Sequence, residues 1–301
     1  MKRALVTGGA GFVGSHIADA LSERGFEVTI FDQERSPWLG RGQRLVQGDI
    51  TDAAQVASAV EGAELIYHLA ALADLNDGKT KPMETARVNL LGTLNVLEAM
   101  RAWAPKARLM FASTIYVFSR EGGFYRCSKQ ACESYIEEYA RVFGLAYTVL
   151  RYGSLYGPRS GPSNGVYRLL QQAASKGRIA YPGSPDDLRE YIHVEDAARL
   201  SVDAAAPEFS GRHLVLTGVQ GTRAHDLFTM FGEILGKPIE VDYGNEQQGH
   251  YKVTPYAFTP RPGHKLTATH FVDMGQGLLQ VVEQLHQSLH EQHGHGDKGK
   301  A

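Results

Sequence analysis

Residues 7–14 read Thr-Gly-Gly-Ala-Gly-Phe-Val-Gly, between an apolar run and a stretch with helical spacing that closes at Gly25. The apolar run suits a buried parallel strand, and a glycine such as Gly25 commonly follows a helix end. Gly8, Gly11 and Gly14 are therefore predicted to lie on a strand-to-helix turn. Glycine there permits a tight turn, close approach of a pyrophosphate and close packing of helix on strand. The helix N-terminus adds free N–H groups and a positive dipole end.

A second apolar run, residues 27–31, ends at Asp32, which lies 18 residues after Gly14. An acid at this place accepts hydrogen bonds from the adenosine ribose hydroxyls of a bound dinucleotide. Its charge repels a 2'-phosphate and so favours NAD over NADP, whereas Arg35 nearby acts in the opposite direction. Three glycines alone are compatible with an ordinary turn. Strand, helix, second strand and acid in register favour a dinucleotide site.

The bulk composition is that of an ordinary globular protein, with 301 residues, 43% hydrophobic and 21% charged. The net charge of −2 gives no electrostatic reason to expect nucleic acid or an anionic membrane as a partner. We find no apolar run long enough to span a bilayer, and the first predicted strand begins at once, so we expect a cytoplasmic protein without a signal peptide. Cys127 and Cys132 lie too close on one predicted helix for a structural disulfide, as expected in a reducing compartment.

Four of the 12 histidines crowd the C-terminus among glycines. A frayed helix end followed by a disordered tail over residues 289–301 is favoured over a metal site, and no metal is predicted. These histidines are His286, His290, His293 and His295.

Strand candidates alternate with helical stretches through the first half of the chain. This alternation predicts an α/β fold with a doubly wound, Rossmann-type parallel sheet, whose ligands bind beyond the carboxyl ends of the strands. The further strand candidates are residues 45–47, 65–69, 109–112, 147–150 and 213–216, and the further helix candidates are residues 52–61, 85–103 and 125–143.

The composition shifts after about residue 157, where Gly-Pro and Pro-Gly pairs punctuate the chain. We expect a smaller, loop-rich, mixed α/β substrate domain, and a return to the first domain as a helix and a final strand. The predicted division is residues 1–156 and 189–218 for the NAD-binding domain, 157–188 and 219–288 for the substrate domain, and 289–301 for the tail.

Tyr125 and Lys129 are four residues apart on a predicted helix and so face the same way. A free tyrosine has a pKa of about 10 and is a poor base at neutral pH. A lysine ammonium beside it, together with the positive nicotinamide ring of NAD, favours the phenolate. Tyr125 could then remove a hydroxyl proton while hydride leaves the same carbon, and Lys129 could hold the nicotinamide ribose. An amphipathic helix with a surface lysine is the alternative.

Ser113 and Thr114 follow the fifth predicted strand. A hydroxyl there could hydrogen-bond the reacting oxygen and relay its proton. The residues alone leave open whether this pair merely caps a strand end.

A series of short motifs runs in order along nearly the whole chain. They are Thr7-Gly8-x-x-Gly11-x-x-Gly14, Asp32, Gly48-Asp49-Ile50, His68-Leu69-Ala70-Ala71, Asn89-x-x-Gly92-Thr93-x-Asn95, Phe111-Ala112-Ser113-Thr114, Tyr125-x-x-x-Lys129, Arg151-Tyr152 with Tyr156-Gly157-Pro158, and Arg189-Glu190-Tyr191-Ile192-His193. Jointly they resemble the extended short-chain dehydrogenase/reductase family, and within it the NAD-dependent sugar epimerases and dehydratases.

The resemblance implies NAD as cofactor and a nucleotide-diphosphate sugar as substrate. It implies Thr114, Tyr125 and Lys129 as catalytic residues. Arg189 resembles an arginine that grips the nucleotide diphosphate, which suits a guanidinium fork; an ion pair with Asp186 or Asp187 is the alternative. The implied cofactor contacts are Gly8, Gly11, Phe12, Val13, Gly14, Asp32, Asp49, Ile50, Leu69, Ala70, Ala71, Asn89, Tyr125 and Lys129, and the implied substrate contacts are Thr114, Tyr152, Ser154, Arg189 and Arg261.

Departures from the family pattern narrow the predicted reaction. The acid pair that 4,6-dehydratases carry after the threonine is replaced by Ile115 and Tyr116, and the glutamate of decarboxylating relatives is missing as well. Cys127 is expected to pack within its helix. The remaining set suffices for reversible oxidation at one carbinol carbon. This favours a 4-epimerase, which oxidises carbon 4, lets the ketosugar turn over and returns hydride to the other face.

The sugar and nucleotide stay open. Ser154 stands where many epimerases place an asparagine, and only ten residues separate Thr114 from Tyr125. A net dehydrogenase or reductase of a nucleotide-linked sugar shares every catalytic residue, and a non-catalytic NAD-binding regulatory protein is a more remote alternative. Family members often pair through two helices, so we expect a homodimer joined through residues 85–103 and 125–143.

Overall fold

The structure is a computed structural model that describes residues 2–75, 80–244, 251–258, 278, 279 and 282. The chain divides into two units, residues 1–259 and 260–301. The three sheets and the helices that pack on them belong to the first unit. The histidines of the C-terminus, the tail over residues 289–301 and Arg261 lie outside the described residues.

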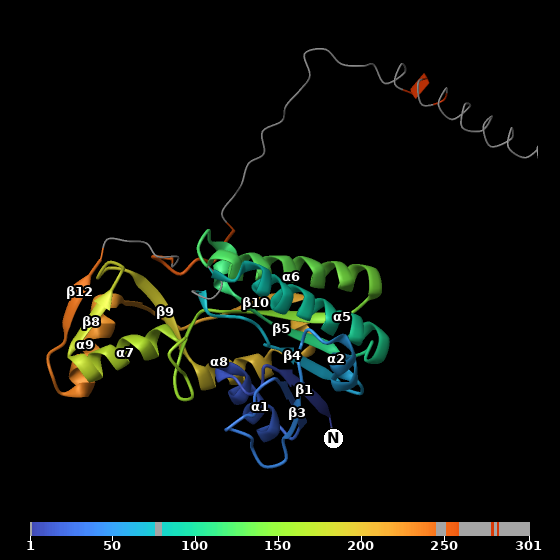
Figure 1. Cartoon of the computed structure of the whole chain (residues 1–301), viewed down its shortest axis with the longest axis horizontal. Helices are drawn as coiled ribbons and strands as arrows, with labels where there is room; N and C mark the ends of the chain where they lie inside the picture. Colours follow the sequence, from blue (N-terminus) through green and yellow to red (C-terminus); the bar gives the residue numbers. More distant parts are fainter. Residues whose placement is uncertain (1, 76–79, 245–250, 259–277, 280–281, 283–301) are drawn as a thin grey trace, which may run out of the picture. The chain divides into compact units, whose positions relative to one another are not determined.

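Seven strands form one wholly parallel sheet in the order β3-β2-β1-β4-β5-β6-β10. The order runs outward in both directions from β1 and β4, as the predicted doubly wound fold requires. The first unit thus confirms the Rossmann-type sheet (Figure 1). Its strands are β1 (Arg3–Thr7), β2 (Glu27–Asp32), β3 (Arg44–Gln47), β4 (Leu65–His68), β5 (Arg108–Thr114), β6 (Ala146–Tyr152) and β10 (Arg212–Leu216).

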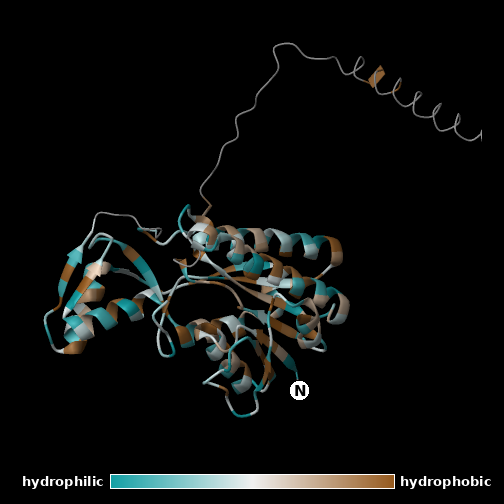
Figure 2. Ribbon diagram, viewed as in Figure 1, coloured by the Kyte–Doolittle hydropathy of each residue, from teal (hydrophilic) through white to brown (hydrophobic). Residues whose placement is uncertain are grey.

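Helices cover both faces of this sheet, and each face has its own apolar core. On one face pack α1 (Phe12–Glu23) and α8 (Val194–Asp203), with Ile17, Leu21 and Ala197 fully buried. On the other face pack α2 (Ala53–Val60), α5 (Gly92–Trp103) and α6 (Gly123–Phe143). Figure 2 shows hydrophobic residues along the strands and the adjoining helices. None of the described helices has the length and apolarity needed to cross a bilayer.

The helix predicted over residues 85–103 is interrupted. It consists of α4 (Pro82–Thr85), a π-helical stretch η1 (Ala86–Leu91) and α5. Such wide turns are rare and often lie at functional sites. Here the stretch carries Asn89, whose side chain binds both backbone groups of Leu72 in the loop after β4. The periodicity of the sequence does not distinguish this local widening from a regular helix.

The remaining elements form a smaller layer beyond the strand ends. One three-stranded sheet joins β11, β9 and β7, and a two-stranded sheet joins β12 and β8. The chain re-enters the large sheet through α8 and β10 as expected, but strand β9 before α8 was not predicted. These elements are β7 (Ser154–Tyr156), β8 (Arg178–Tyr181), β9 (Leu188–His193), β11 (Gly221–Arg223), β12 (Glu240–Tyr243), α7 (Gly165–Lys176) and α9 (Ala224–Leu235). Two 3-10 turns belong to the large sheet's connections: η2 (Ile115–Phe118) follows β5, and η3 (Pro207–Phe209) lies between α8 and β10.

The turn between β1 and α1 is so tightly packed that its backbone atoms leave no space for a side chain at Gly8 or Gly14. Gly8 has φ +72°, and a Cβ there would lie 2.6 Å from Ala70 N. A Cβ on Gly14 would lie 2.2 Å from Gly8 O and 2.8 Å from Gly9 Cα. Gly14 therefore sets how closely helix and strand can approach, the packing role that the sequence predicted for it.

We expect Gly14→Ala to lower the free energy of unfolding by about 1–3 kcal/mol, because the new methyl group meets backbone that cannot move aside. Denaturant unfolding followed by circular dichroism measures this. Gly165→Ala is the matched control, since a Cβ at this first residue of α7 meets nothing within 4 Å. The control variant should be as stable as the parent, and equal stability of both variants would contradict the packing role.

Candidate active site

A cavity of about 990 Å³ opens at the carboxyl ends of the parallel strands. The β1–α1 turn and the ends of β2, β4 and β5 line one part of it. Residues of β7, β8 and β9 and the segments around them line the other. The cavity thus lies where the strand order reverses, the place where open α/β sheets bind ligands.

The glycine-rich turn presents unpaired backbone donors to this cavity. In the described part of the chain, no side chain caps the N-terminus of α1. The first N–H groups of a helix have no intrahelical acceptor and carry the positive end of the helix dipole. Gly11, Phe12 and Val13 line the cavity at this point. An uncapped helix N-terminus behind three glycines fits a pyrophosphate.

Asp32 lies at the end of β2 and faces the same turn. Its Oδ2 accepts from Ala10 N at 2.9 Å, and its Oδ1 accepts from Glu34 N at 3.1 Å. The carboxylate thereby fixes the glycine-rich turn from the neighbouring strand. Each oxygen keeps further acceptor capacity for the hydroxyls of a ribose.

Five further predicted cofactor residues line the cavity, but Asn89 does not. Asn89 is 2% exposed, and its side chain binds Leu72 N, Leu72 O and Ser128 Oγ. It holds the loop after β4 in place and touches no ligand space. Asp49 accepts from the backbone and side chain of Thr51, which lowers the pKa of its carboxyl. The five are Asp49, Ile50, Leu69, Ala70 and Ala71.

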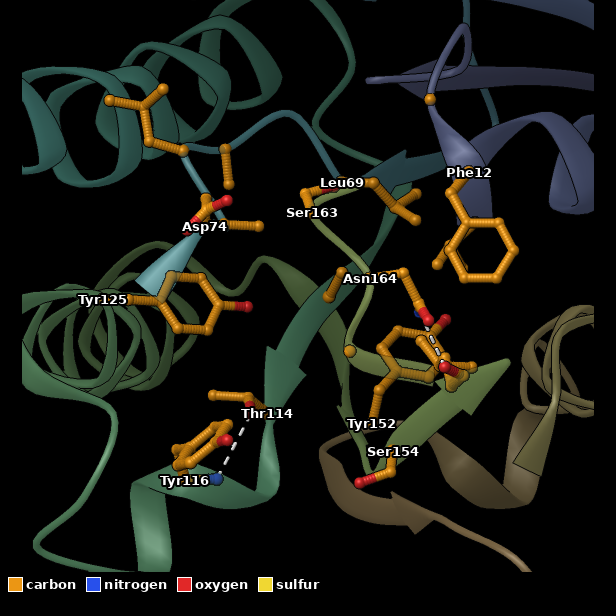
Figure 3. A pocket seen from close by; sticks show the side chains of 18 of the residues that line it. Phe12, Leu69, Asp74, Thr114, Tyr116, Tyr125, Tyr152, Ser154, Ser163 and Asn164 are labelled. Carbon is orange, nitrogen blue, oxygen red and sulfur yellow. Dashed lines mark hydrogen bonds between the residues drawn. The ribbon is translucent and has the colours of Figure 1, made fainter. Parts of the chain in front are cut away.

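Tyr125 and Lys129 lie four residues apart on α6, as predicted, and both line the cavity. The Lys129 side chain is 3% exposed, and its Nζ donates to Ala112 O of β5 at 2.7 Å. The ammonium lies 4.7 Å from the centre of the Phe111 ring and 5.8 Å from that of Tyr125. Figure 3 shows Tyr125 and Thr114 pointing into the same part of the cavity.

Burial changes the proton affinities of Tyr125 and Lys129. Burial raises the pKa of Tyr125 well above its usual value, and Lys129 does not offset this effect. Burial lowers the pKa of Lys129 to about 8. Lys129 therefore does not overcome the effect of burial on Tyr125, and the predicted joint effect of Lys129 and the nicotinamide ring stays a prediction. The Lys129 ammonium donates a hydrogen bond to the carbonyl oxygen of Ala112 on β5.

The hydroxyl groups of Ser113 and Thr114 have different hydrogen-bond partners. Ser113 lines the cavity, but its hydroxyl donates its proton to Glu133 Oε1 at 2.5 Å. The Thr114 Oγ1 accepts from Tyr116 N at 3.2 Å and keeps its own proton to donate into the cavity (Figure 3). Thr114 is therefore the hydroxyl available to a ligand, as the resemblance implied.

Neither residue after Thr114 offers an acid. Ile115 is 1% exposed and packs in an apolar cluster. The Tyr116 ring packs at a tilt of 57° against the Tyr251 ring, with ring centres 5.1 Å apart, and burial raises the pKa of Tyr116. Tyr116 therefore lines the cavity beside Thr114, whereas Ile115 packs in the apolar cluster and does not line it.

The substrate side of the cavity is built around Arg189 and tyrosines. The Arg189 guanidinium lies 5.7 Å from the centre of the Tyr251 ring. The buried Nε of Arg189 has no hydrogen-bond partner among the described residues. The alternative of an ion pair with a neighbouring acid is not supported, because Asp187 accepts from Tyr181 and Asp186 lies 3.6 Å from Arg223. A buried guanidinium that lines a cavity and is not neutralised by these acids is suited to binding an anionic ligand.

The other predicted substrate residues differ in what they can offer. The Tyr152 hydroxyl is bonded to Ser201 Oγ at 2.6 Å, so only its ring faces the cavity. Ser154 lies 3.1 Å from the Tyr251 hydroxyl and also lines the cavity. Cys127, which was expected to pack within its helix, is exposed.

Several lining residues were missed by the sequence analysis. Tyr251 comes from a segment far along the chain with no recognisable pattern. Asn164, which caps α7 by accepting from Tyr167 N, could have been found as an N-cap residue. The residues missed include Asp74, Ser163, Asn164, Tyr181, Asp187, Tyr191 and Tyr251, of which Figure 3 labels Asp74, Ser163 and Asn164.

Comparisons with known proteins agree with this geometry. Residues 4–216 match the NAD dependent epimerase/dehydratase family. A putative UDP-glucose 4-epimerase from Methanocaldococcus jannaschii is 27% identical, over 92% of this chain and 96% of the relative. A UDP-N-acetyl-alpha-D-glucosaminuronate decarboxylase from Bacillus cytotoxicus is 29% identical, over 91% of this chain and 92% of the relative. The crystal structure of UDP-glucose 4-epimerase from Thermotoga maritima with UDP-glucose matches with a TM-score of 0.77 and 28% identity, over 85% of this chain and 90% of that chain.

We expect Asp32→Asn to reduce the preference for NAD over NADP by at least about tenfold, because it removes both a charged acceptor and a repulsive charge. The asparagine oxygen can still accept from Ala10 N, so the turn should persist. Calorimetric titration with each dinucleotide measures the ratio. Glu34→Gln is the matched control, since it removes a neighbouring charge that does not hold the turn. An unchanged ratio in Asp32→Asn would show that the acid does not select the cofactor.

Proposed function

We propose, for a chain that belongs to the NAD-dependent epimerase/dehydratase family, that it is a nucleotide-sugar epimerase acting at carbon 4. The observation that carries this proposal is the cluster of Thr114, Tyr125 and Lys129 in the cavity, beside Tyr116. The cluster supports removal of a proton and a hydride from one carbinol carbon. Neither of the two positions after Thr114, Ile115 and Tyr116, offers a carboxylate for expelling water.

NAD, when bound, accepts a hydride from the substrate carbon and can return it. The residues around it do the remaining work. Thr114 donates a hydrogen bond to the reacting oxygen, and Tyr125 takes the hydroxyl proton and later gives it back. Lys129, held by Ala112 O, presents a fixed positive charge to the ribose and to the phenol.

The rest of the cavity supports a nucleotide-diphosphate sugar as substrate. Arg189 supplies a buried guanidinium for the diphosphate, and Ser154 and the ring of Tyr152 would contact the sugar. We retain Arg261 as a further substrate contact. The proposal includes the division into an NAD-binding domain (1–156 and 189–218) and a substrate domain (157–188 and 219–288), and a cytoplasmic location.

We expect proton NMR in heavy water, with NAD and a panel of UDP-, GDP- and dTDP-sugars, to reveal a new 4-epimer that keeps its carbon-bound hydrogen. Retention follows because the hydride is removed and returned without exchange. Stoichiometric NADH absorbance would instead indicate a net dehydrogenase or reductase of a nucleotide-linked sugar. Deuterium entering beside a keto group would indicate carbanion chemistry, as used by other members of the family.

Tyr125→Phe is the matched control for this experiment. It should lower turnover by about 10²–10⁴-fold while leaving NAD affinity within a factor of a few, because only the proton-transferring hydroxyl is lost. Retained turnover would contradict the role of Tyr125. Cofactor binding with no reaction of any sugar nucleotide by the parent protein would favour a non-catalytic NAD-binding regulator.

A homodimer joined through α5 and α6 is part of the proposal. Large apolar side chains are exposed on these helices, including Trp103, Val142 and Phe143, and Figure 2 shows hydrophobic colour at their C-terminal ends. A surface of this kind favours association with a second copy. The guanidinium of Arg101 lies 4.9 Å from the Phe143 ring centre and adds an aromatic–cation contact at its edge.

We expect light scattering to give the mass of a dimer, and Trp103→Glu to shift it to a monomer, because a charge would be buried without a partner. Ile234→Glu on α9, an exposed apolar residue on another helix, should leave the dimer intact. A monomeric parent protein, or loss of the dimer only in Ile234→Glu, would refute the interface.

A further inference from the structure

A buried ion pair and a hydrogen bond join the helix that carries Tyr125 to two strands, β6 and the strand β5 that carries Thr114. Glu133 on α6 is 5% exposed. Its Oε1 accepts from Ser113 Oγ at 2.5 Å and from Arg151 Nε at 3.1 Å, and its Oε2 accepts from Arg151 Nη2 at 2.7 Å. Both partners come from adjacent parallel strands, β5 and β6. The carboxylate therefore fixes α6 against two strands at once.

The network continues to the edge of the sheet. His213 on β10 lies with Nδ1 2.9 Å from Arg151 Nη2 and Nε2 3.0 Å from Glu137 Oε1. The Arg151 guanidinium also lies 4.6 Å from the centre of the Phe118 ring. Glu137 is 54% exposed, so the network runs from solvent to the catalytic end of β5.

Three consecutive residues of β5 each make a different contact with α6 or with the cavity. Ala112 O accepts from Lys129 Nζ, Ser113 Oγ donates to Glu133, and Thr114 faces the cavity. Lys129 and Glu133 are one helical turn apart, so their side chains lie on the same face of α6. Any shift of α6 along β5 would therefore displace Tyr125 from Thr114.

Glu133 also supplies a negative charge close to Lys129. The titratable groups that face Lys129 are Tyr125, Cys132 and Glu133 on α6 and His68 on β4. Burial lowers the pKa of His68 to about 3 and raises that of Cys132, so both are uncharged where Lys129 titrates. Within the described part of the chain, Glu133 is the remaining group of this set with an opposite charge.

Glu133 keeps that charge throughout the working range of pH. Burial opposes its ionisation, but the neighbouring His213 and the hydrogen bonds from Arg151 and Ser113 outweigh this and lower its pKa to about 2. Burial lowers the pKa of Lys129 to about 8, and the negative charges of Cys132, when ionised, and of Glu133 work against this decrease. Removing the carboxylate charge must therefore lower the pKa of Lys129 further.

We propose that Glu133 is a positioning residue for the catalytic group: its contacts with Ser113 and Arg151 hold α6 in register with β5, and its charge keeps the Lys129 ammonium protonated. No catalytic contact is assigned to Glu133 itself, which acts through Lys129 and the β5 strand. The inference rests on the proposed function only in taking Lys129 as the group that serves hydride transfer.

The direct test is an NMR titration of Lys129 in the full-length protein labelled with ¹³C-lysine, with the resonance assigned by its loss in Lys129→Met. The wild-type midpoint should lie near 8. In Glu133→Gln it should fall by roughly one unit, the lower end of the effect of a nearby opposite charge. Glu137→Gln, which removes the same charge two turns from Lys129, should leave the midpoint unchanged.

The pH profile of kcat provides the second readout. Lys129 must be charged to act, so activity is lost as the pH rises through its pKa. The alkaline limb should therefore begin at lower pH in Glu133→Gln and stay in place in Glu137→Gln. Glu133→Asp keeps the charge on a shorter side chain, which reaches Ser113 and Arg151 less well. In this variant the alkaline limb should return to its wild-type pH, while kcat stays lower by on the order of tenfold.

The proposal would be overturned if Lys129 titrated with the same midpoint in Glu133→Gln as in the wild type. It would also be overturned if the midpoint shifted but the alkaline limb of the kcat profile did not. If Glu133→Gln does not fold, Glu133→Gln/Arg151→Met leaves neither charge buried alone and allows the same titration. A shifted midpoint in a protein that turns over no nucleotide sugar would refute the proposed function and leave the coupling between Glu133 and Lys129 intact.

Discussion

The contact of α6 with the end of β5 is the constraint on which the site depends. A helix laid on a parallel sheet can slide, and apolar packing alone tolerates small shifts. Here Lys129 binds a backbone carbonyl of β5 and Glu133 binds the next side chain along the strand. Backbone oxygens cannot be displaced independently of their strand. The spacing of Tyr125 from Thr114 is thereby tied to main-chain geometry.

The cofactor end of the cavity obeys a different constraint, which is steric. Gly8 and Gly14 leave no space for a side chain, whereas a Cβ on Gly11 would meet only Gly8 O, at 3.3 Å, among the described residues. The first and third glycines are thus required by the packing of the protein itself. The second stands exposed at the uncapped helix end, where the requirement would come from a ligand.

Much of this architecture could be predicted from the sequence, because its signals are local. Apolar runs, the glycine spacing and Asp32 indicated the order of strands and helices along the chain, and the spacing of Tyr125 and Lys129 indicated the helix that carries them. Contacts between distant residues could not be predicted in this way. The π-helical turn at Asn89 and the ring contact of Tyr251 with Tyr116 depend on residues that no short pattern connects. Asn89 shows the consequence, since a motif residue assigned to the cofactor in fact holds a loop.

The proton affinity of Tyr125 shows why a motif does not by itself establish a mechanism. Four residues of spacing predict that Lys129 lies near Tyr125, and it does. Spacing cannot reveal that burial outweighs the lysine, because desolvation depends on every element that closes over the ring. The phenol is therefore neutral with only the protein's own side chains around it. A positive charge brought by a ligand is needed to release its proton, so ionisation of Tyr125 should be coupled to cofactor binding, with Lys129 and Glu133 setting the pH range in which that coupling operates.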